Sequence, residues 1–321
     1  MSRLKQWLWM IIVVAAMLAA GMVSGQDFPN KPIRIVTAGT GGTADLVARL
    51  IGQGFSAAFS QQVVVDNRGG SFIIPVQAVA KAPPDGYTLL LLSNGVWTLP
   101  FLQNVPYDPV RDLAPITLAA SSPLILVVHP SLPVSTVKAL IALGKARPGE
   151  LNYATGPTGT SNHLAGELFR SMTGVNIVRV SYKGTGTAFS DLLAGQVQLM
   201  FANVAPVTPH VKSGRLRALA VTSPAPSVLF PGLPTMAAAG VPGYESEAIL
   251  GVFAPAGTPE GVIGRLNQEI VRTLTRADVK ERLFNASVET VASAPEQLAA
   301  TIKADMVRMG KVIKEAGIRQ E

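Results

Sequence analysis

Short apolar runs alternate with amphipathic segments along the chain after residue 30. The stretch 33–51 sets the pattern, with an apolar run, a turn rich in glycine and threonine, and then apolar residues at helical spacing. The same order recurs at 151–169 and at 177–195. Because strands that alternate with helices form parallel sheets covered by helices on both faces, this pattern predicts an α/β protein.

Turn residues and helix-capping residues mark the remaining elements. Further strands are predicted at 63–65, 87–92, 116–118, 124–128, 197–201, 216–221, 249–253 and 287–291. Further helices are predicted at 75–82, 135–147, 206–212, 259–274, 278–284 and 295–316. The length of 321 residues is sufficient for two domains.

Three turns rich in glycine and threonine each follow a predicted strand and open a predicted helix. They lie at 39–44, 155–161 and 184–187. In open α/β sheets ligands bind beyond the carboxyl ends of the strands, so the three turns are expected to face one another. Their backbone N–H groups and helix dipoles favour an anion. Lys183 is the one cation beside them in the sequence, and neutral donors suit a small carboxylate that is held and then released.

Two other interpretations of these turns stay open. The glycines could simply make tight turns, which explains one such segment better than three. The first turn also fits the dinucleotide-binding pattern G-x-G-x-x-G/A, with Asp66 as the acid at the end of the next strand. That acid lies 27 residues after Gly39, which is long for the pattern, so an NAD-dependent oxidoreductase is the disfavoured alternative. Without a GxSxG motif or a convincing nucleophile–base pair, no enzymatic activity and no cofactor are predicted.

The composition narrows the function classes further. The chain has no cysteine and three histidines, which disfavours a disulfide framework and a histidine-rich metal site. Its net charge of +7 comes from scattered basic residues without interleaved aromatic residues. Binding to nucleic acid is therefore not expected.

The N-terminus is typical of a secretory signal peptide. Arg3 and Lys5 precede an apolar stretch at 7–20, and small residues stand before Gln26. The apolar stretch is short for a membrane span, so an uncleaved anchor is the less favoured alternative. Residues 1–25 are predicted to be removed, which leaves a periplasmic protein that is not embedded in the membrane.

Ordered motifs along nearly the whole mature chain carry a family resemblance. They are KPIRIV (31–36), GGTAD (41–45), VVVDNR (63–68), AVAKAPPDGYTLL (78–90), YDPVRDLAPIT (107–117), LVVHPSLPV (126–134), LNYATGPTGTSNHLAGELF (151–169), VSYKGTG (180–186), DLLAGQVQLMF (191–201), GRLRALAVTS (214–223) and GVFAPAGTP (251–259). The chain resembles the extracytoplasmic solute receptors of the tripartite tricarboxylate transporter type, also called TctC or Bug receptors.

This resemblance implies a two-lobed periplasmic-binding-protein fold of type II, in which each lobe is a mixed sheet flanked by helices. Lobe 1 would comprise 26–125 and 249–321, and lobe 2 would comprise 126–248. Two crossover strands, near 124–128 and 248–253, would join the lobes. The ligand would lie in the cleft between them.

The resemblance also implies a ligand site and a role. Members of the family hold a carboxylate through backbone groups and hydroxyls of the first two turns, and the lobes close by a hinge motion. Carried onto this chain, the ligand-binding residues would be Gly41, Gly42, Thr43, Thr158, Gly159, Thr160 and Ser161, with Tyr182, Gly184 and Asn203 nearby. The sequence adds Phe72, Asn94, His163 and Ala202 as further candidate ligand-binding residues. The expected partners are a small organic carboxylate and the subunits of a membrane permease. A receptor that instead feeds a sensor or regulator is the alternative within binding proteins.

Some of these positions remain open to a second interpretation or depart from the family pattern. His163 and Tyr182 could each contact a ligand or satisfy local polar groups, and Phe72 could line the site or plug the core. Many members have Asp where this chain has Ala202, and loss of that acid removes a partner for a ligand ammonium group. The segment 69–74 is apolar where the family usually has a Pro/Gly-rich loop. We therefore expect a carboxylate with an apolar or aromatic body rather than an amino acid.

Overall fold

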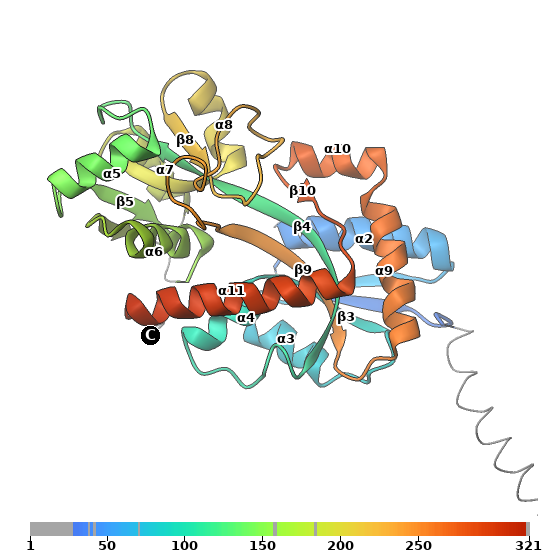
Figure 1. The fold of residues 1–321 in the computed structure, drawn as a ribbon. Coiled ribbons are helices and arrows are strands. Elements are labelled where there is room, and N and C mark those ends of the chain that lie inside the picture. Colours follow the sequence, from blue (N-terminus) through green and yellow to red (C-terminus); the bar gives the residue numbers. More distant parts are fainter. Residues whose placement is uncertain are drawn as a thin grey trace, which may run out of the picture.

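The architecture is that of an α/β protein, as the sequence pattern predicts, but its sheets are mixed, as the family resemblance implies, and not purely parallel. The computed structural model describes residues 28–37, 39–40, 43–69, 71–156, 159–182 and 185–318. Figure 1 shows two groups of strands and helices that long strands connect. The predicted signal peptide, residues 1–25, lies outside the described residues.

Lobe 1 is built on one mixed sheet. Its strands are β1 (Ile33–Thr37), β2 (Val63–Asn67), β3 (Thr88–Ser93), β4 (Leu113–Val128), β9 (Glu247–Pro255) and β10 (Glu289–Thr290). Its helices are α2 (Thr43–Phe59), α3 (Ile73–Ala80), α4 (Gly95–Thr98), η1 (Leu99–Phe101), α9 (Glu260–Leu274) and α10 (Ala277–Asn285). The strand order is β2–β1–β3–β9–β4, with β10 paired to β4. β1 is parallel to β2 and β3, whereas β9 is antiparallel to β3 and β4.

Lobe 2 repeats the alternation of strands and helices. Its strands are β5 (Asn152–Thr155), β6 (Val178–Ser181), β7 (Leu199–Asn203) and β8 (Arg217–Val221). Its helices are α5 (Val137–Ala146), α6 (Ser161–Thr173), α7 (Thr185–Leu193) and α8 (Val204–Lys212). β5 is parallel to β6 and β7, and β7 and β8 are antiparallel to β4.

One long strand belongs to both sheets. β4 pairs with β9 as far as Pro123, and its last part, from Leu124 to Val128, pairs with β7 and β8. β9 begins beside this crossing, where Glu247 pairs with Pro123. The predicted lobe boundaries fall within these two strands.

The pattern of apolar residues divided β4 wrongly into two strands, at 116–118 and 124–128. The residues between them, AASSP at 119–123, are weak strand formers. Pairing with β9 on one side and with β10 on the other keeps this segment extended. The continuous strand therefore depends on partners that are distant in the sequence.

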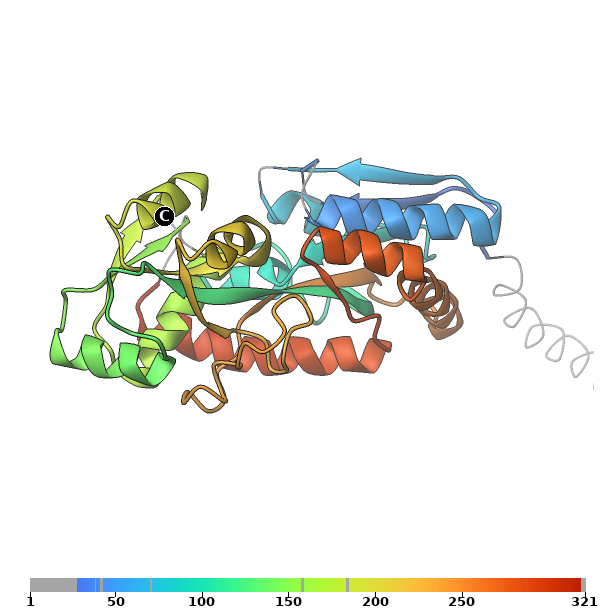
Figure 2. The same cartoon turned by 90° about the horizontal axis from the view of Figure 1, so that it is seen from above.

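The C-terminal helix α11 (Pro295–Glu315) runs along both lobes, as Figures 1 and 2 show. On the lobe 1 side, the buried indole N–H of Trp97 donates to Asp305 at 2.8 Å. Toward lobe 2, Arg308 pairs with Glu245 at 2.7 Å, and the helix packs against α6. The division into lobes drawn from the resemblance places this helix in lobe 1, whereas in the structure it contacts both lobes.

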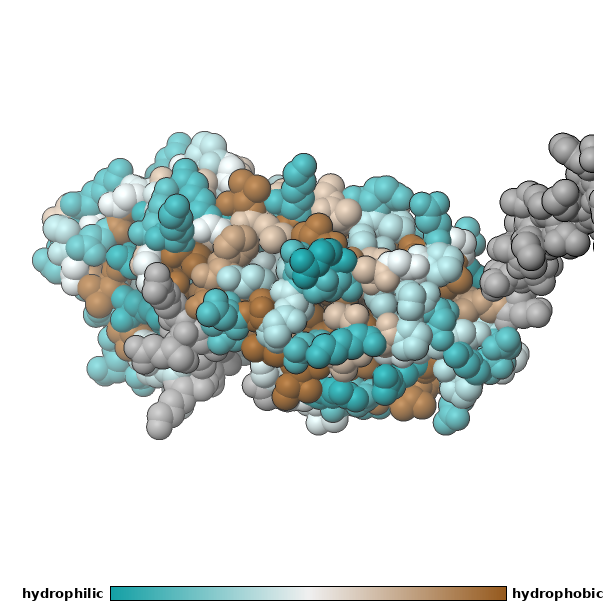
Figure 3. Space-filling view, turned by 90° about the horizontal axis from the view of Figure 1, so that it is seen from below, coloured by the Kyte–Doolittle hydropathy of each residue, from teal (hydrophilic) through white to brown (hydrophobic). Residues whose placement is uncertain are grey.

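Each lobe buries an apolar core between its sheet and its helices. In lobe 1, Phe55 of α2 and Ile270 of α9 belong to one buried cluster. In lobe 2, the rings of Phe169 and Phe201 lie with centroids 5.7 Å apart. On the outside, Figure 3 shows hydrophilic residues spread over the visible face, with smaller hydrophobic areas between them. Within the described part of the chain, no helix has the length and apolar character needed to span a membrane.

Candidate functional site

A cavity of about 760 Å³ lies between the two lobes, a volume in the range of small-molecule sites. Lobe 1 contributes the first turns of α2 and α4, the segment before α3, and η1. Lobe 2 contributes the first turns of α6 and α8. Residues where β4 and β9 cross also line the cavity. The first and second turns identified in the sequence therefore face a common space.

The structure places the predicted ligand-binding residues in three groups. Those that line the cavity are Thr43, Phe72, Asn94, Gly159, Thr160, Ser161 and Asn203. Those that lie outside the described residues are Gly41, Gly42, Thr158 and Gly184. Those that are described but do not line the cavity are His163, Tyr182 and Ala202. Contact between the lining residues and a ligand stays a prediction.

The polar residues of the lining that the structure describes are uncharged. Thr43 begins α2 in lobe 1, and Thr160 and Ser161 are the N-cap and the first residue of α6 in lobe 2. Among the described lining residues, none has a charged side chain. Hydroxyl groups, backbone N–H groups and the positive ends of helix dipoles therefore supply the attraction for an anion.

An apolar wall adjoins these polar groups. The ring of Phe72 packs on Gly95 so closely that a Cβ at residue 95 would lie 2.6 Å from it. Leu99, Leu102 and Leu164 continue the wall and belong to one buried cluster with Phe72 packed against it. Phe72 is therefore both a lining residue and a packing residue.

The two lobes touch at this wall. Gly159 has a φ of +84°, and a Cβ there would lie 2.8 Å from Leu102 of lobe 1. Met309 and Ile313 of α11 belong to the same cluster as Leu102. The C-terminal helix thus packs behind the apolar end of the cavity.

Some lining residues gave no signal in the sequence. Ser287 follows α10 and reaches the cavity because β10 pairs with β4. The hydroxyl of Ser122, at the crossing of the strands, donates to the backbone carbonyl of Ser287 at 3.1 Å. Ser93 is different, because it directly follows the strand predicted at 87–92 and could have been identified from that position.

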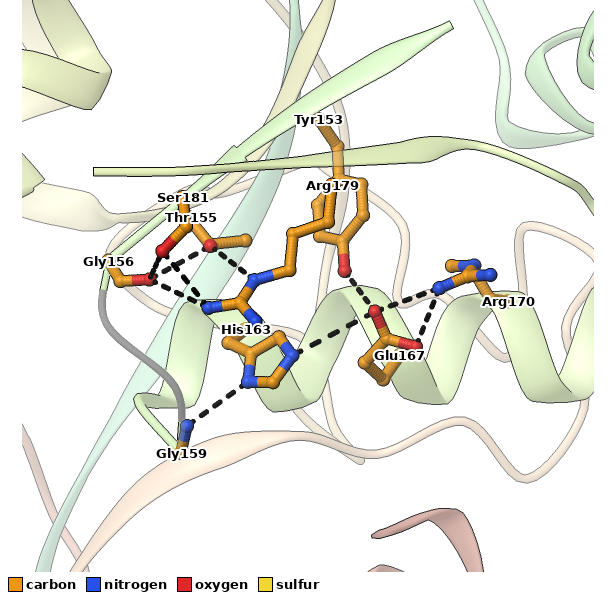
Figure 4. Close-up of polar contacts among 9 residues, drawn as sticks. All are labelled: Tyr153, Thr155, Gly156, Gly159, His163, Glu167, Arg170, Arg179 and Ser181. Atoms are coloured by element: carbon orange, nitrogen blue, oxygen red, sulfur yellow. Dashed lines mark hydrogen bonds and ion pairs between the residues drawn. The ribbon is translucent and has the colours of Figure 1, made fainter. Parts of the chain in front are cut away.

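A buried polar network lies beneath the turn that opens α6 (Figure 4). The backbone N–H of Gly159 donates to Nδ1 of His163 at 3.1 Å, and the Nε2 atom of this ring lies 3.9 Å from Oε1 of Glu167. Glu167 also accepts a hydrogen bond from the hydroxyl of Tyr153, and Arg170 pairs with it at 2.9 Å. Burial and the hydrogen bond to Glu167 raise the pKa of Tyr153.

This arrangement changes the roles expected for three residues. The N–H of Gly159 donates to His163 and is therefore not free for a ligand. His163 satisfies this local polar group and does not face the cavity. The hydroxyl of Tyr182 donates to Asp191 at 2.7 Å. Ala202 is 1% exposed and lies in an apolar core cluster, so an acid at this position would point into the core rather than toward a ligand.

We expect the free energy of unfolding to fall by roughly 3 kcal/mol when the pH is lowered from 7 to 4, because His163 is buried in its neutral state. Burial, and then the charge of Arg179, lower the pKa of this side chain from 6.5 to about 4. Between these values the unfolded chain binds a proton that the folded chain does not. Stability present above pH 6.5 is therefore lost as the pH falls.

Urea unfolding at a series of pH values measures this loss. Other groups also titrate in this range, so the difference between the wild type and His163→Asn isolates the histidine. The variant should lose less stability on acidification than the wild type. Parallel profiles for the two proteins would contradict the assignment.

Comparisons with known proteins agree with this architecture. The model of the family described as "Tripartite tricarboxylate transporter family receptor" matches residues 47–318. BugT of Bordetella pertussis is 37% identical to the chain, over 99% of each protein. The structure of R. palustris Rpa4515 with adipate is 37% identical, with a TM-score of 0.74 over 91% of this chain and 99% of that one. MatC from Rhodopseudomonas palustris with bound malate is 28% identical, with a TM-score of 0.70 over 89% of this chain and 100% of that one.

Two lobes around a cavity whose described lining is uncharged, with helix N-termini at its walls, define a solute-binding receptor. The chain belongs to the tripartite tricarboxylate transporter family of receptors. The resemblance seen in the motifs and the two-lobed fold that it implied are confirmed. Since the family and its homologues are solute-binding receptors, the NAD-dependent oxidoreductase alternative is set aside.

Proposed function

We propose that this chain is a periplasmic receptor that binds a small organic carboxylate between its lobes and delivers it to a membrane permease of the tripartite tricarboxylate type. One observation carries the proposal: α2, which begins at Thr43, and α6, which begins at Ser161, open from different lobes onto the same cavity, whose described lining is uncharged. First-turn N–H groups have no acceptor within their own helix and attract anions. The adipate and malate in two related structures support a carboxylate.

The remainder of the lining favours a carboxylate whose body is apolar. Phe72, Leu99, Leu102 and Leu164 offer apolar surface beside the polar groups. The described lining residues include no acid that would pair with an ammonium group. The expectation of a ligand with an apolar body therefore depends on this wall. It does not depend on Ala202, because that residue is buried in the core and does not line the cavity.

A thermal-shift screen of the purified protein tests the ligand class. The panel holds mono-, di- and tricarboxylates, aromatic acids, amino acids and NAD, and the neutral diamide of adipic acid is the matched control for adipate. A ligand at about 100-fold its Kd adds roughly 2.7 kcal/mol of stability. At about 2–4 °C per kcal/mol, the melting temperature should rise by several degrees.

The expected result is a shift from one class of carboxylate and none from the diamide. An equal shift from acid and diamide, or a shift from NAD alone, would contradict the proposal. In cells, uptake of the radiolabelled acid should require both this receptor and a permease of the tripartite type. Uptake that survives deletion of the receptor gene would argue against delivery.

A further inference from the structure

The turn before α6 includes a flexible residue, Gly159, whose backbone conformation is fixed by contacts with other residues. Gly159 has a φ of +84°, and because glycine adopts many backbone conformations, ordering it costs more entropy than ordering other residues. Its neighbour Thr160 is the N-cap of α6, and the next residue is Ser161. A different conformation at Gly159 would therefore change the direction of the N–H groups of Thr160 and Ser161, the next two residues.

We propose that His163 is a positioning residue for the carboxylate site: its Nδ1 atom holds the N–H of Gly159 and thereby directs the first turn of α6 toward the cavity. The bond of 3.1 Å connects the glycine to a ring one turn further along the chain. His163 is 2% exposed and does not line the cavity, so it acts through the backbone and not on the ligand. This inference rests on the proposed function, because it names what fixes the shape of that site.

On its other side the ring faces a carboxylate. Its Nε2 atom lies 3.9 Å from Oε1 of Glu167, and Figure 4 shows the ring between the turn and this carboxylate. Arg170 donates to both carboxylate oxygens of Glu167, at 3.1 and 2.9 Å, and the hydroxyl of Tyr153 donates to one of them. A ring flip would move Nδ1 away from Gly159 and Nε2 away from Glu167, so these contacts favour one ring orientation.

Arg179 of β6 fixes the opposite end of the turn. Its Nε atom donates to the hydroxyl oxygen of Thr155 at 3.0 Å, and one of its terminal nitrogens lies 3.4 Å from the carbonyl oxygen of Gly156. The described residues on both sides of 157–158 are thus tied to buried or half-buried side chains. A binding site held in this way pays less ordering entropy when its ligand arrives.

The charges around His163 favour the protonation state that this role requires. A neutral ring with its proton on Nε2 has an acceptor at Nδ1, whereas an imidazolium has none. Burial is the main cause that lowers the pKa of His163 to about 4, and Arg179 and Arg170 add to it. Glu167 acts in the opposite direction but does not reverse the shift. The acceptor is therefore present at neutral pH.

Two substitutions separate the acceptor from the rest of the side chain. His163→Asn keeps an oxygen acceptor near the position of Nδ1, and His163→Leu fills a similar volume without an acceptor. The probe is the acid from the thermal-shift panel that stabilises the wild type most, titrated by calorimetry at pH 7. We expect His163→Leu to raise the Kd roughly 10-fold or more, and His163→Asn to keep it within about 3-fold of the wild type. Equal losses in the two variants would overturn the positioning role.

A second readout needs no ligand. Nitrogen NMR of the free protein should show the tautomer with its proton on Nε2, and the ring should stay neutral down to about pH 4. An Nδ1–H tautomer, or titration near pH 6.5, would overturn the inference even if carboxylates bind normally. Absence of binding by every acid of the panel would instead overturn the proposed function, and this role with it.

Discussion

Replacing Ser161 by Asp should weaken carboxylate binding by roughly 100-fold or more, because like charges brought together cost several kcal/mol. Ser161 is the first residue of α6 and lines the cavity. An acid in the first turn complements the helix dipole, so the variant should be at least as stable as the wild type without ligand. The same acid repels an anion at this helix end. Calorimetric titration with the acid selected by the screen measures the change in Kd.

A matched control places the same charge on a helix N-terminus away from the cavity. Thr136 is the N-cap of α5, and its hydroxyl accepts the N–H of Ala139 at 3.1 Å. Thr136→Asp keeps this cap and adds one negative charge at an exposed position, so its affinity should equal that of the wild type. Full affinity in Ser161→Asp, or an equal loss in both variants, would show that α6 does not bind the carboxylate.

Replacing Trp97 by Ala should lower the free energy of unfolding by about 3–5 kcal/mol, the usual cost of truncating a buried aromatic side chain. Trp97 is fully buried, its indole N–H donates to Asp305 of α11, and its ring packs edge-on against Phe253 at 6.2 Å between centroids. The substitution therefore opens a hole and breaks a connection between α4 and α11. Urea unfolding followed by far-ultraviolet circular dichroism measures the loss.

Trp97→Phe separates packing from hydrogen bonding. This variant keeps most of the apolar contact with Phe253 and loses the bond to Asp305, so it should cost about 1–3 kcal/mol, less than Trp97→Ala. Unchanged stability in the alanine variant would contradict the view that α11 is anchored to lobe 1 through this residue.

Those parts of the cavity that a single segment of the sequence specifies could be predicted. The turn at 39–44 and the turn at 155–161 each show glycine and threonine between a strand pattern and a helix pattern. Such short-range chemistry specifies where a strand ends and a helix begins. The positions of Thr43 and Ser161 at the cavity follow from it.

The other parts of the cavity lining depend on contacts between segments that are distant in the sequence. Ser287 reaches the cavity only through the pairing of β10 with β4, and Leu102 meets Gly159 only when the two lobes are brought together. No local pattern carries this information. Ala202 is a further case, because only the structure shows that it shares a buried face of β7 with Met200.

The network around His163 lies between these two cases. The spacing of His163 and Glu167 on one helix places them on the same face. Their shared role, however, depends on Tyr153 from β5 and Arg179 from β6, which only the folded sheet brings beneath the turn. Sequence reasoning could identify the histidine but not decide between its two interpretations.

Binding of a carboxylate between the lobes is tested by a crystal structure of the protein with the acid that the screen selects. We expect density for the ligand in the cavity between the lobes, with its carboxylate within hydrogen-bonding distance of the first turn of α6 and its body against Phe72 and Leu102. A ligand bound outside this cavity, or with its carboxylate turned away from α6, would contradict the central claim.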